Sequence, residues 1–284
     1  MTAALRKRGL DWLLNAYAGL ALIYLLVPIA VIIVFSFNDP IGRFNFVWEQ
    51  FSLDAWKHPF AVQGVGDALK TSIEIAALST LIATALGTLT ALALVRYEFR
   101  GRSPVNFFIF IPLATPEVVL GAALLSQFLN WGTPQLGFVT ILIAHVMFNL
   151  SFVVITVRSR LIGFDRSLEE AAQDLGATPW ETFRLVTLPL IMPGVAAAAL
   201  LAFALSIDDF VITNFNSGST ITFPLFIWGA ARVAVAPQIY VIATMIFLFT
   251  VAMMLITVWQ QRRAEKLAAV RPDEPELALE PAPA

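Results

Sequence analysis

The sequence contains no cysteine and few charged residues. The absence of cysteine from the 284 residues excludes disulfides, thiolate zinc sites and cysteine nucleophiles. Charged residues make up 13% of the chain, against roughly 25% in soluble domains, while hydrophobic residues make up 58%. The net charge of −2 gives no indication of a nucleic-acid partner. The chain is therefore predicted to place most of its surface in a lipid bilayer.

Sequence patterns for metal and nucleotide sites are also missing. The two histidines, His58 and His145, lie far apart in the sequence, and no HExxH occurs. No GxxxxGK[ST] loop is present, so the chain has no phosphate-binding loop of this kind. We therefore expect no catalytic, metal or cofactor site on this chain.

Six apolar segments are long enough to cross a bilayer, which takes about 20 residues each. They lack the alternation of barrel strands, and only helices or closed barrels satisfy the backbone in lipid. The predicted fold class is therefore all-α, a polytopic membrane protein. The segments are 13–37, 69–95, 105–128, 136–157, 188–212 and 239–259.

The distribution of lysine and arginine predicts the orientation. With the N-terminus inside, 14 of the 18 basic residues fall in inner segments, and only Arg43, Lys57, Lys70 and Arg232 fall in outer ones. This bias places both termini in the cytoplasm. We predict a cytoplasmic N-terminus (1–12), a transmembrane domain (13–262) and a disordered, proline-rich and acidic cytoplasmic tail (263–284). A short re-entrant or interfacial helix is expected between the last two spans.

A polar inner loop, residues 163–189, is predicted to form a helical hairpin. Ser167 with Glu170, and Thr178 with Glu181, fit capping boxes that begin two short helices. Gly176 falls where the first helix must end, because glycine tolerates the left-handed conformation. A well-capped hairpin without a partner and a docking element are both compatible with these caps.

The spacing of this loop resembles the EAA loop of ABC importer membrane subunits. Glu170-Ala171-Ala172 is followed after three residues by Gly176, after nine more by Val186, and after one more by Leu188-Pro189. The family usually has isoleucine in place of Val186. The resemblance implies a type I importer permease whose loop is a coupling helix seated on an ATPase subunit. The implied ATPase-coupling residues are Glu170, Ala171, Ala172, Gly176, Leu188 and Pro189.

The resemblance also implies the assembly in which the chain works. Two permease subunits, identical or different, would join an ATPase dimer and an extracytoplasmic solute-binding protein in a bacterial cell membrane. ATP and Mg²⁺ would be bound by the ATPase, so this chain would be a transport subunit and not an enzyme. The segments "ALALVRYEFRGR", "RLIGFDRSLEEAAQDLGA" and "FALSIDDFVITNF" look like the second permease subunit of spermidine/putrescine importers.

Three acidic residues in the apolar segments are candidates for a substrate pathway. An ionisable group at bilayer depth costs about 2.5–3.5 kcal/mol, so each needs a partner or a function. Asp208 and Asp209 either reach outer water or form a cation-selective lining or gate, and at most one of two adjacent helical positions can face a pore. Glu117 follows Pro112 and Pro116, and either lines the pathway or packs against another subunit.

One further polar pair and several alternatives remain. His145 and Asn149 share a helix face and predict an interhelical hydrogen bond.

The solute could be a polyamine, another amine or an amino-acid derivative. A stand-alone secondary transporter would require paired broken helices, which the sequence does not show. A membrane enzyme would require clustered His, Asp or Glu residues, and no histidine lies near the Asp208-Asp209 pair in the sequence.

Overall fold

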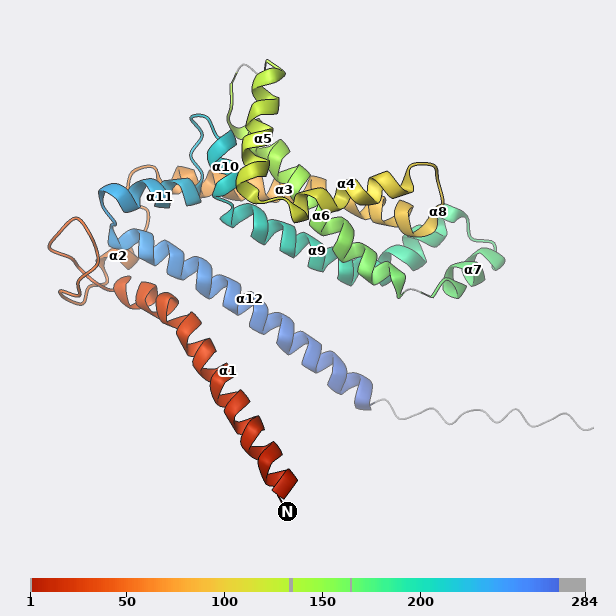
Figure 1. Cartoon of the computed structure of the whole chain (residues 1–284), viewed down its shortest axis with the longest axis horizontal. Helices are drawn as coiled ribbons and strands as arrows, with labels where there is room; N and C mark the ends of the chain where they lie inside the picture. The colour runs from red at the N-terminus through yellow and green to blue at the C-terminus, as the bar shows by residue number, and fades with distance from the viewer. Residues whose placement is uncertain (1, 133–134, 164, 271–284) are drawn as a thin grey trace, which may run out of the picture. The chain divides into compact units, whose positions relative to one another are not determined.

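The structure is a computed structural model that describes residues 2–132, 135–163 and 165–270. Within these residues the chain forms twelve α-helices and one π-helical turn, which confirms the all-α prediction. In chain order the elements are α1 (Thr2–Phe35), α2 (Asp54–Lys57), α3 (Val65–Arg96), α4 (Arg102–Ala114), α5 (Glu117–Asn130), α6 (Phe138–Ile162), α7 (Ser167–Asp174), α8 (Pro179–Thr182), the π-turn η1 (Phe183–Thr187), α9 (Leu188–Asp208), α10 (Val211–Asn216), α11 (Phe223–Val233) and α12 (Pro237–Val270) (Figure 1).

The chain divides into two units. The first comprises Met1–Val62 and Ala234–Ala284, and the second comprises Gln63–Val233. The second unit contains α3 to α11 and every candidate site residue.

Four of the six predicted spans correspond to single long apolar helical segments. These are Trp12–Phe35, Val65–Arg96, Phe138–Ile162 and Pro179–Asp208. The sixth predicted span, 239–259, lies within α12, which is 34 residues long. The re-entrant or interfacial helix expected before it corresponds to the 11-residue α11.

The third predicted span, 105–128, is not one straight helix. It is formed by α4 and α5, which meet at an angle of 113°. Thr115 between them is extended, with φ −89° and ψ 131°, because the ring of Pro116 disfavours helical geometry in the residue before it. A break within this span is what its two prolines, Pro112 and Pro116, predict.

The fifth span also differs from the prediction. It begins before Leu188, because α8, η1 and α9 form one continuous helical segment, Pro179–Asp208. The backbone widens at η1, where the N–H of Leu188 donates to the carbonyl of Phe183. Pro189 is the second residue of α9 and directly follows this widened turn. The segment ends at Asp208, four residues before the predicted end at Ile212.

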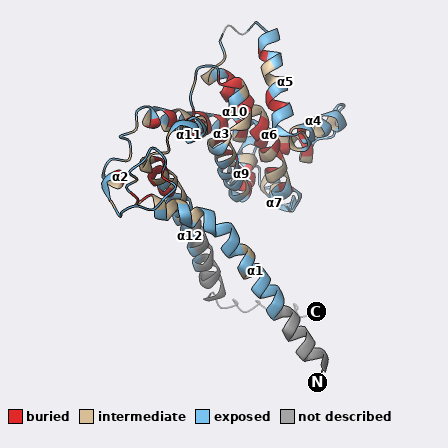
Figure 2. Cartoon of the chain, turned by 60° about the vertical axis from the view of Figure 1, so that its left-hand side comes forward, coloured by how far each residue is buried: buried red, intermediate tan, exposed pale blue. Residues whose placement is uncertain are grey.

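The core of the second unit is formed by α3, α6 and α9. These helices lie side by side (Figure 1) and bury small and β-branched residues between them. Gly87 of α3 lies so close to α6 that an added Cβ would be 2.6 Å from Cγ1 of Val153. Such close approach of small residues is how membrane helices gain packing energy without a hydrophobic force between them. Buried residues are concentrated on the facing sides of these helices (Figure 2).

The first unit consists of α1, α2, α12 and the loop after α1. None of the residues in the most apolar stretch of α1 is buried within the chain, so this surface is available to lipid or to another subunit. The loop is held by Asn38, whose amide donates to Asn45 Oδ1 at 2.6 Å and to the Val47 carbonyl at 2.7 Å.

Two predicted domain boundaries do not coincide with helix ends. The helix α1 already begins at Thr2, within the segment predicted as a separate N-terminus (1–12). The helix α12 continues to Val270, so residues 263–270 of the predicted disordered tail are helical. The remainder of that tail, 271–284, lies outside the described residues.

Candidate coupling hairpin and intramembrane acids

The first helix of the hairpin, α7, ends in a Schellman motif. Gly176 has a φ of +90°, its N–H donates to the carbonyl of Gln173 at 2.9 Å, and the N–H of Ala177 donates to that of Ala172 at 3.0 Å. The left-handed conformation explains why glycine is placed there. The predicted end of this helix is confirmed.

The second helix, α8, begins with the predicted capping box. The side chain of Thr178 accepts from the N–H of Glu181 at 3.3 Å, and Glu181 accepts from the N–H of Thr178 at 2.8 Å. Pro179 occupies the first helical position. Both predictions for this end are confirmed.

The capping box predicted for Ser167 and Glu170 is wrong. Arg166 takes the N-cap position with no side-chain hydrogen bond, and Ser167 is already helical. The carboxylate of Asp165 instead accepts the N–H of Ser167 at 2.9 Å. This backbone hydrogen bond stabilises the ionised form and lowers the pKa of Asp165. Asp165, two residues upstream, therefore accepts the N–H of Ser167 that the capping box assigns to Glu170.

The two adjacent glutamates of α7 have different surroundings. Glu169 is turned inward, where its carboxylate pairs with Arg96 at the end of α3 and with the hydroxyl of Thr187 in η1. Arg166 adds a hydrogen bond to the Val95 carbonyl at 3.2 Å. Glu170, by contrast, is exposed. The hairpin is thus fastened to α3 by one face and leaves the face carrying Glu170 free.

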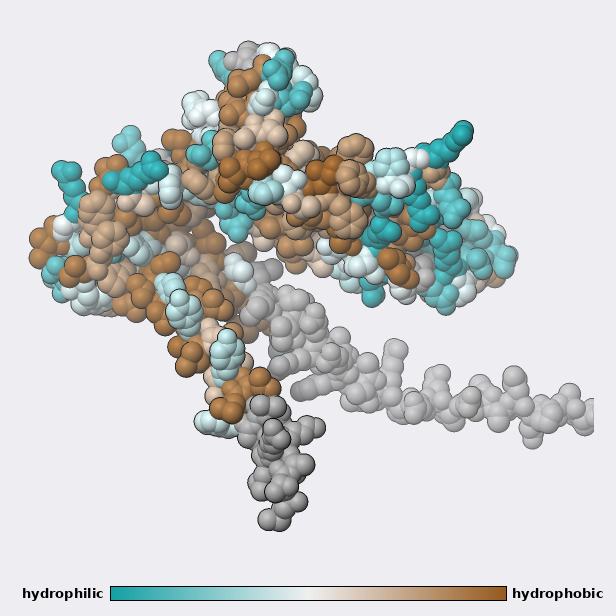
Figure 3. All heavy atoms as spheres, viewed as in Figure 1, coloured by the Kyte–Doolittle hydropathy of each residue, from teal (hydrophilic) through white to brown (hydrophobic). Residues whose placement is uncertain are grey.

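The free surface of the hairpin is partly apolar. Leu175 is 90% exposed, Trp180 67% and Leu185 69%. Ala171 is exposed as well, while Ala172 is half-buried. This part of the second unit is otherwise hydrophilic, as Figure 3 shows around α7 and α8. Large exposed apolar side chains on a polar protrusion indicate a protein contact surface.

The spacing of the EAA loop ends in two residues that differ in exposure. Leu188 is half-buried and packs against the core of α3, α6 and α9, and Pro189 is exposed. Both lie inside the continuous helical segment, beyond η1.

The two adjacent aspartates point in different directions. Asp208 is the last residue of α9 and is exposed. Asp209 is extended, with ψ 118°, and its side chain is only 6% exposed. Its carboxylate accepts from the N–H of Thr213 at 2.8 Å, from the Thr213 hydroxyl at 2.7 Å and from the N–H of Ile212 at 3.3 Å. Asp209 therefore holds the start of α10, whereas Asp208 is free to face a ligand.

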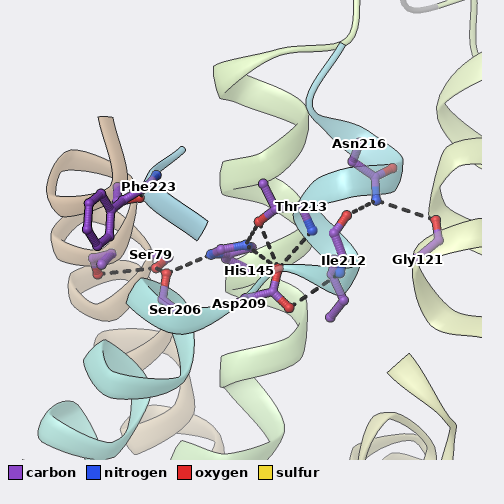
Figure 4. A network of polar contacts seen from close by, with 11 residues as sticks. Ser79, Gly121, His145, Ser206, Asp209, Ile212, Thr213, Asn216 and Phe223 are labelled. Carbon is purple, nitrogen blue, oxygen red and sulfur yellow. Dashed lines mark hydrogen bonds and ion pairs between the residues drawn. The ribbon is translucent and has the colours of Figure 1, made fainter. Parts of the chain in front are cut away.

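A buried polar network connects Asp209 to three other helices (Figure 4). Nε2 of His145 in α6 lies 3.2 Å from Oδ2 of Asp209, and Nδ1 lies 2.6 Å from the hydroxyl of Ser206 in α9. The Ser206 hydroxyl lies 3.0 Å from that of Ser79 in α3. The network joins α3, α6, α9 and α10 at one level.

The contact between His145 and Asp209 at the centre of this network was not predicted from the sequence. His145 does form the predicted interhelical hydrogen bonds, but it lies next to Asp209 in space although the two residues are far apart in the sequence. Asn149, expected to share the role of His145, is fully buried, and its amide has no hydrogen-bond partner among the described residues. The sequence does show polar side chains in three apolar segments, but it does not indicate which of these side chains would contact one another.

Glu117 is the third predicted pathway residue. It is the first residue of α5, directly after the 113° bend, and it is exposed. The structure therefore brings Asp209 together with His145 and leaves Asp208 and Glu117 accessible.

Comparison with known proteins identifies the family. Residues 83–266 match the family described as "Binding-protein-dependent transport system inner membrane component". The chain belongs to this family. It is a multi-pass membrane permease of the ABC importer class, as the spacing of the EAA loop predicts.

Several curated relatives of this permease are polyamine transport proteins by name. It is 39% identical over 233 residues to the spermidine/putrescine transport system permease protein PotC of Escherichia coli K12, covering 82% of this chain and 87% of the relative. It is 37% identical over 251 residues to the putrescine transport system permease protein PotI of the same organism, covering 86% and 88%. PotC of Haemophilus influenzae is 36% identical, covering 87% and 95%.

Solved structures show the same fold at lower identity. A bacterial ABC transporter involved in the import of the acidic polysaccharide alginate gives a TM-score of 0.65 at 18% identity, covering 92% of this permease and 98% of that chain. The same kind of transporter in complex with a pentasaccharide-bound periplasmic protein gives 0.61 at 19% identity, covering 89% and 94%.

Proposed function

We propose that this permease is a subunit of an ATP-driven polyamine importer, which takes up spermidine, putrescine or both. The proposal is supported above all by 39% identity to a spermidine/putrescine permease over most of both chains. An exposed carboxylate within an apolar helix, Asp208, fits a substrate carrying ammonium groups. Charge pairing there replaces part of the hydration that a cation loses on entering the membrane.

The hairpin is the proposed docking element for the ATPase. Exposed Glu170 and Ala171, with Leu175 and Trp180 beside them, support a contact with a soluble subunit. ATP and Mg²⁺ are bound by that subunit in this proposal, and the hairpin end of the permease faces the cytoplasm. An extracytoplasmic binding protein delivers the substrate, and a second permease subunit completes the pathway.

Within the pathway, the three acidic residues take different roles. Asp208 contacts the substrate, because it is accessible and lies at the end of α9. Asp209 supports the site by holding α10 and His145. Glu117 remains a candidate contact, since it is exposed next to the bend between α4 and α5.

Uptake by the reconstituted importer tests this proposal. The complete complex, in liposomes with ATP inside and binding protein outside, is assayed with radiolabelled putrescine and spermidine. Asp208→Asn should lower uptake at least tenfold, which corresponds to about 1.4 kcal/mol at the substrate. Glu74→Gln is the matched control, because Glu74 is another exposed acid in a span and pairs with Lys70 at 3.9 Å.

Two results would count against the proposal in different ways. If wild-type liposomes accumulated neither polyamine but did accumulate another amine, the substrate class would be wrong while the transport mechanism stood. If Asp208→Asn and Glu74→Gln transported polyamine equally well, Asp208 would not line the pathway.

A further inference from the structure

A cleft near the hairpin contains more positive charge than its neighbours neutralise. It has a volume of about 350 Å³ and lies between the ends of α3, α4 and α6. Three arginines line it, and the rest of its wall is apolar. The lining residues are Arg102, Arg158, Arg166, Leu94, Val95, Leu161 and Ile162.

The arginines have mostly neutral partners. Arg158 donates to the amide oxygen of Asn106 at 2.8 Å, and Arg166 donates to a backbone carbonyl at 3.2 Å. Arg102 lies 3.8 Å from Glu98, whose side chain is 95% exposed and therefore strongly screened. Three arginines thus line one cleft, and none of the described residues that line it is acidic. Guanidinium groups pair in bidentate fashion with phosphate, so a phosphate-bearing ligand fits this arrangement.

The surface next to the cleft is suited to hydrocarbon chains. Ile162 in its wall is 69% exposed. On α4, which supplies Arg102, Phe107 and Phe108 are each 66% exposed. A free phosphate would gain nothing from these apolar surfaces, whereas an acyl chain would cover them. The polar and apolar parts together match the two parts of a phospholipid.

We propose that this cleft binds the headgroup phosphate of an anionic phospholipid, whose acyl chains lie along α4 and α6. Basic pockets between membrane helices are known to take anionic headgroups. Arg166 directly precedes α7 and also holds the Val95 carbonyl. The bound lipid is therefore in a position to steady the base of the hairpin, independently of the transported solute.

Native mass spectrometry of the assembled importer in detergent tests this site. Phosphatidylglycerol and phosphatidylcholine are titrated separately, and inorganic phosphate is added in a third arm. Phosphatidylglycerol should bind the wild type more tightly than phosphatidylcholine does, and millimolar inorganic phosphate should not displace it. Arg102→Gln should weaken phosphatidylglycerol binding about fivefold, and adding Arg158→Gln should weaken it about 25-fold in total.

The control is Arg100→Gln, which removes the same charge from an exposed residue outside the cleft and should change binding less than twofold. Arg102→Gln is the informative single variant, because the ion pair that it removes, with the 95% exposed side chain of Glu98, is strongly screened. Equal binding by wild type and both variants would overturn the proposal, as would equal affinity for phosphatidylcholine. Displacement by inorganic phosphate would assign the cleft to a soluble phosphate and so refute the lipid.

Discussion

Asp209 should matter for stability, whereas Asp208 should not. Replacing Asp209 by alanine removes the acceptor of three hydrogen bonds to Ile212 and Thr213 and the contact with His145 at 3.2 Å. Side-chain hydrogen bonds in membrane proteins contribute on average about 0.6 kcal/mol and at most about 1.7 kcal/mol each. Four such contacts give an expected loss of about 2–4 kcal/mol for Asp209→Ala.

Two comparisons make this estimate specific. Asp209→Asn keeps one oxygen that can accept from Thr213, so it should lose about half as much as alanine does. Asp208→Ala removes an exposed side chain and should change the free energy of unfolding by less than about 0.5 kcal/mol.

The measurement is the free energy of unfolding of the purified permease in mixed micelles with increasing denaturing detergent. Hydrogen exchange of the amides of Ile212 and Thr213 should rise in Asp209→Ala, because their acceptor is gone. Equal destabilisation by Asp208→Ala and Asp209→Ala would refute the division of roles between the two aspartates.

Two further predictions concern glycines. Gly87→Ala should destabilise the second unit by about 1–3 kcal/mol, because the new Cβ would lie 2.6 Å from Cγ1 of Val153. The midpoint of thermal unfolding in detergent should therefore fall, whereas Gly19→Ala, which has open space around it, should leave the midpoint unchanged or raise it. A midpoint for Gly87→Ala that is unchanged or raised would contradict this prediction. Gly176→Asp should insert normally but recover less ATPase on pull-down, because aspartate is strained at the left-handed φ of +90° that ends α7. Gly163→Asp, in the same loop at a φ of −88° and with equal space for a side chain, should recover the wild-type amount. Equal recovery by both would argue against docking at Gly176.

The features that the sequence predicts well depend on neighbouring residues. The Schellman end at Gly176 and the capping box at Thr178 involve groups within five residues of each other, so their residue types suffice. Long apolar runs likewise predict spans because one bilayer thickness sets their length.

The features that were missed depend on residues far apart or on competition between nearby groups. The contact between His145 and Asp209 requires that α6 and α9 pack in one register, which no local pattern encodes. At the start of α7, Asp165 and Glu170 both offer a carboxylate to the N–H of Ser167, and only the folded backbone decides which one is used. Pro116 indicated a break, but the 113° angle depends on what α4 and α5 pack against.

The positions of the polar contacts suggest how a push on the hairpin could reach the other end of α9. Pro179–Asp208 is one continuous segment of 30 residues, about 45 Å long at 1.5 Å per residue. Glu169, Arg96 and Thr187 tie its hairpin end to α3, and Ser206, with its neighbours, ties its far end to α3 and α6.

The segment is fastened to α3 at both ends and to α6 at its far end, so it cannot slide past these helices without breaking those hydrogen bonds. We infer that α3, α6 and α9 move as one body when the hairpin is displaced, which is the rigid-body form of alternating access. Within the segment, helical hydrogen bonding is altered at η1, at Pro189 beside it and at Pro193, and any bending of α9 should be confined to these places. Asp208, at the end of this body, would then change its access together with the hairpin and not independently of it.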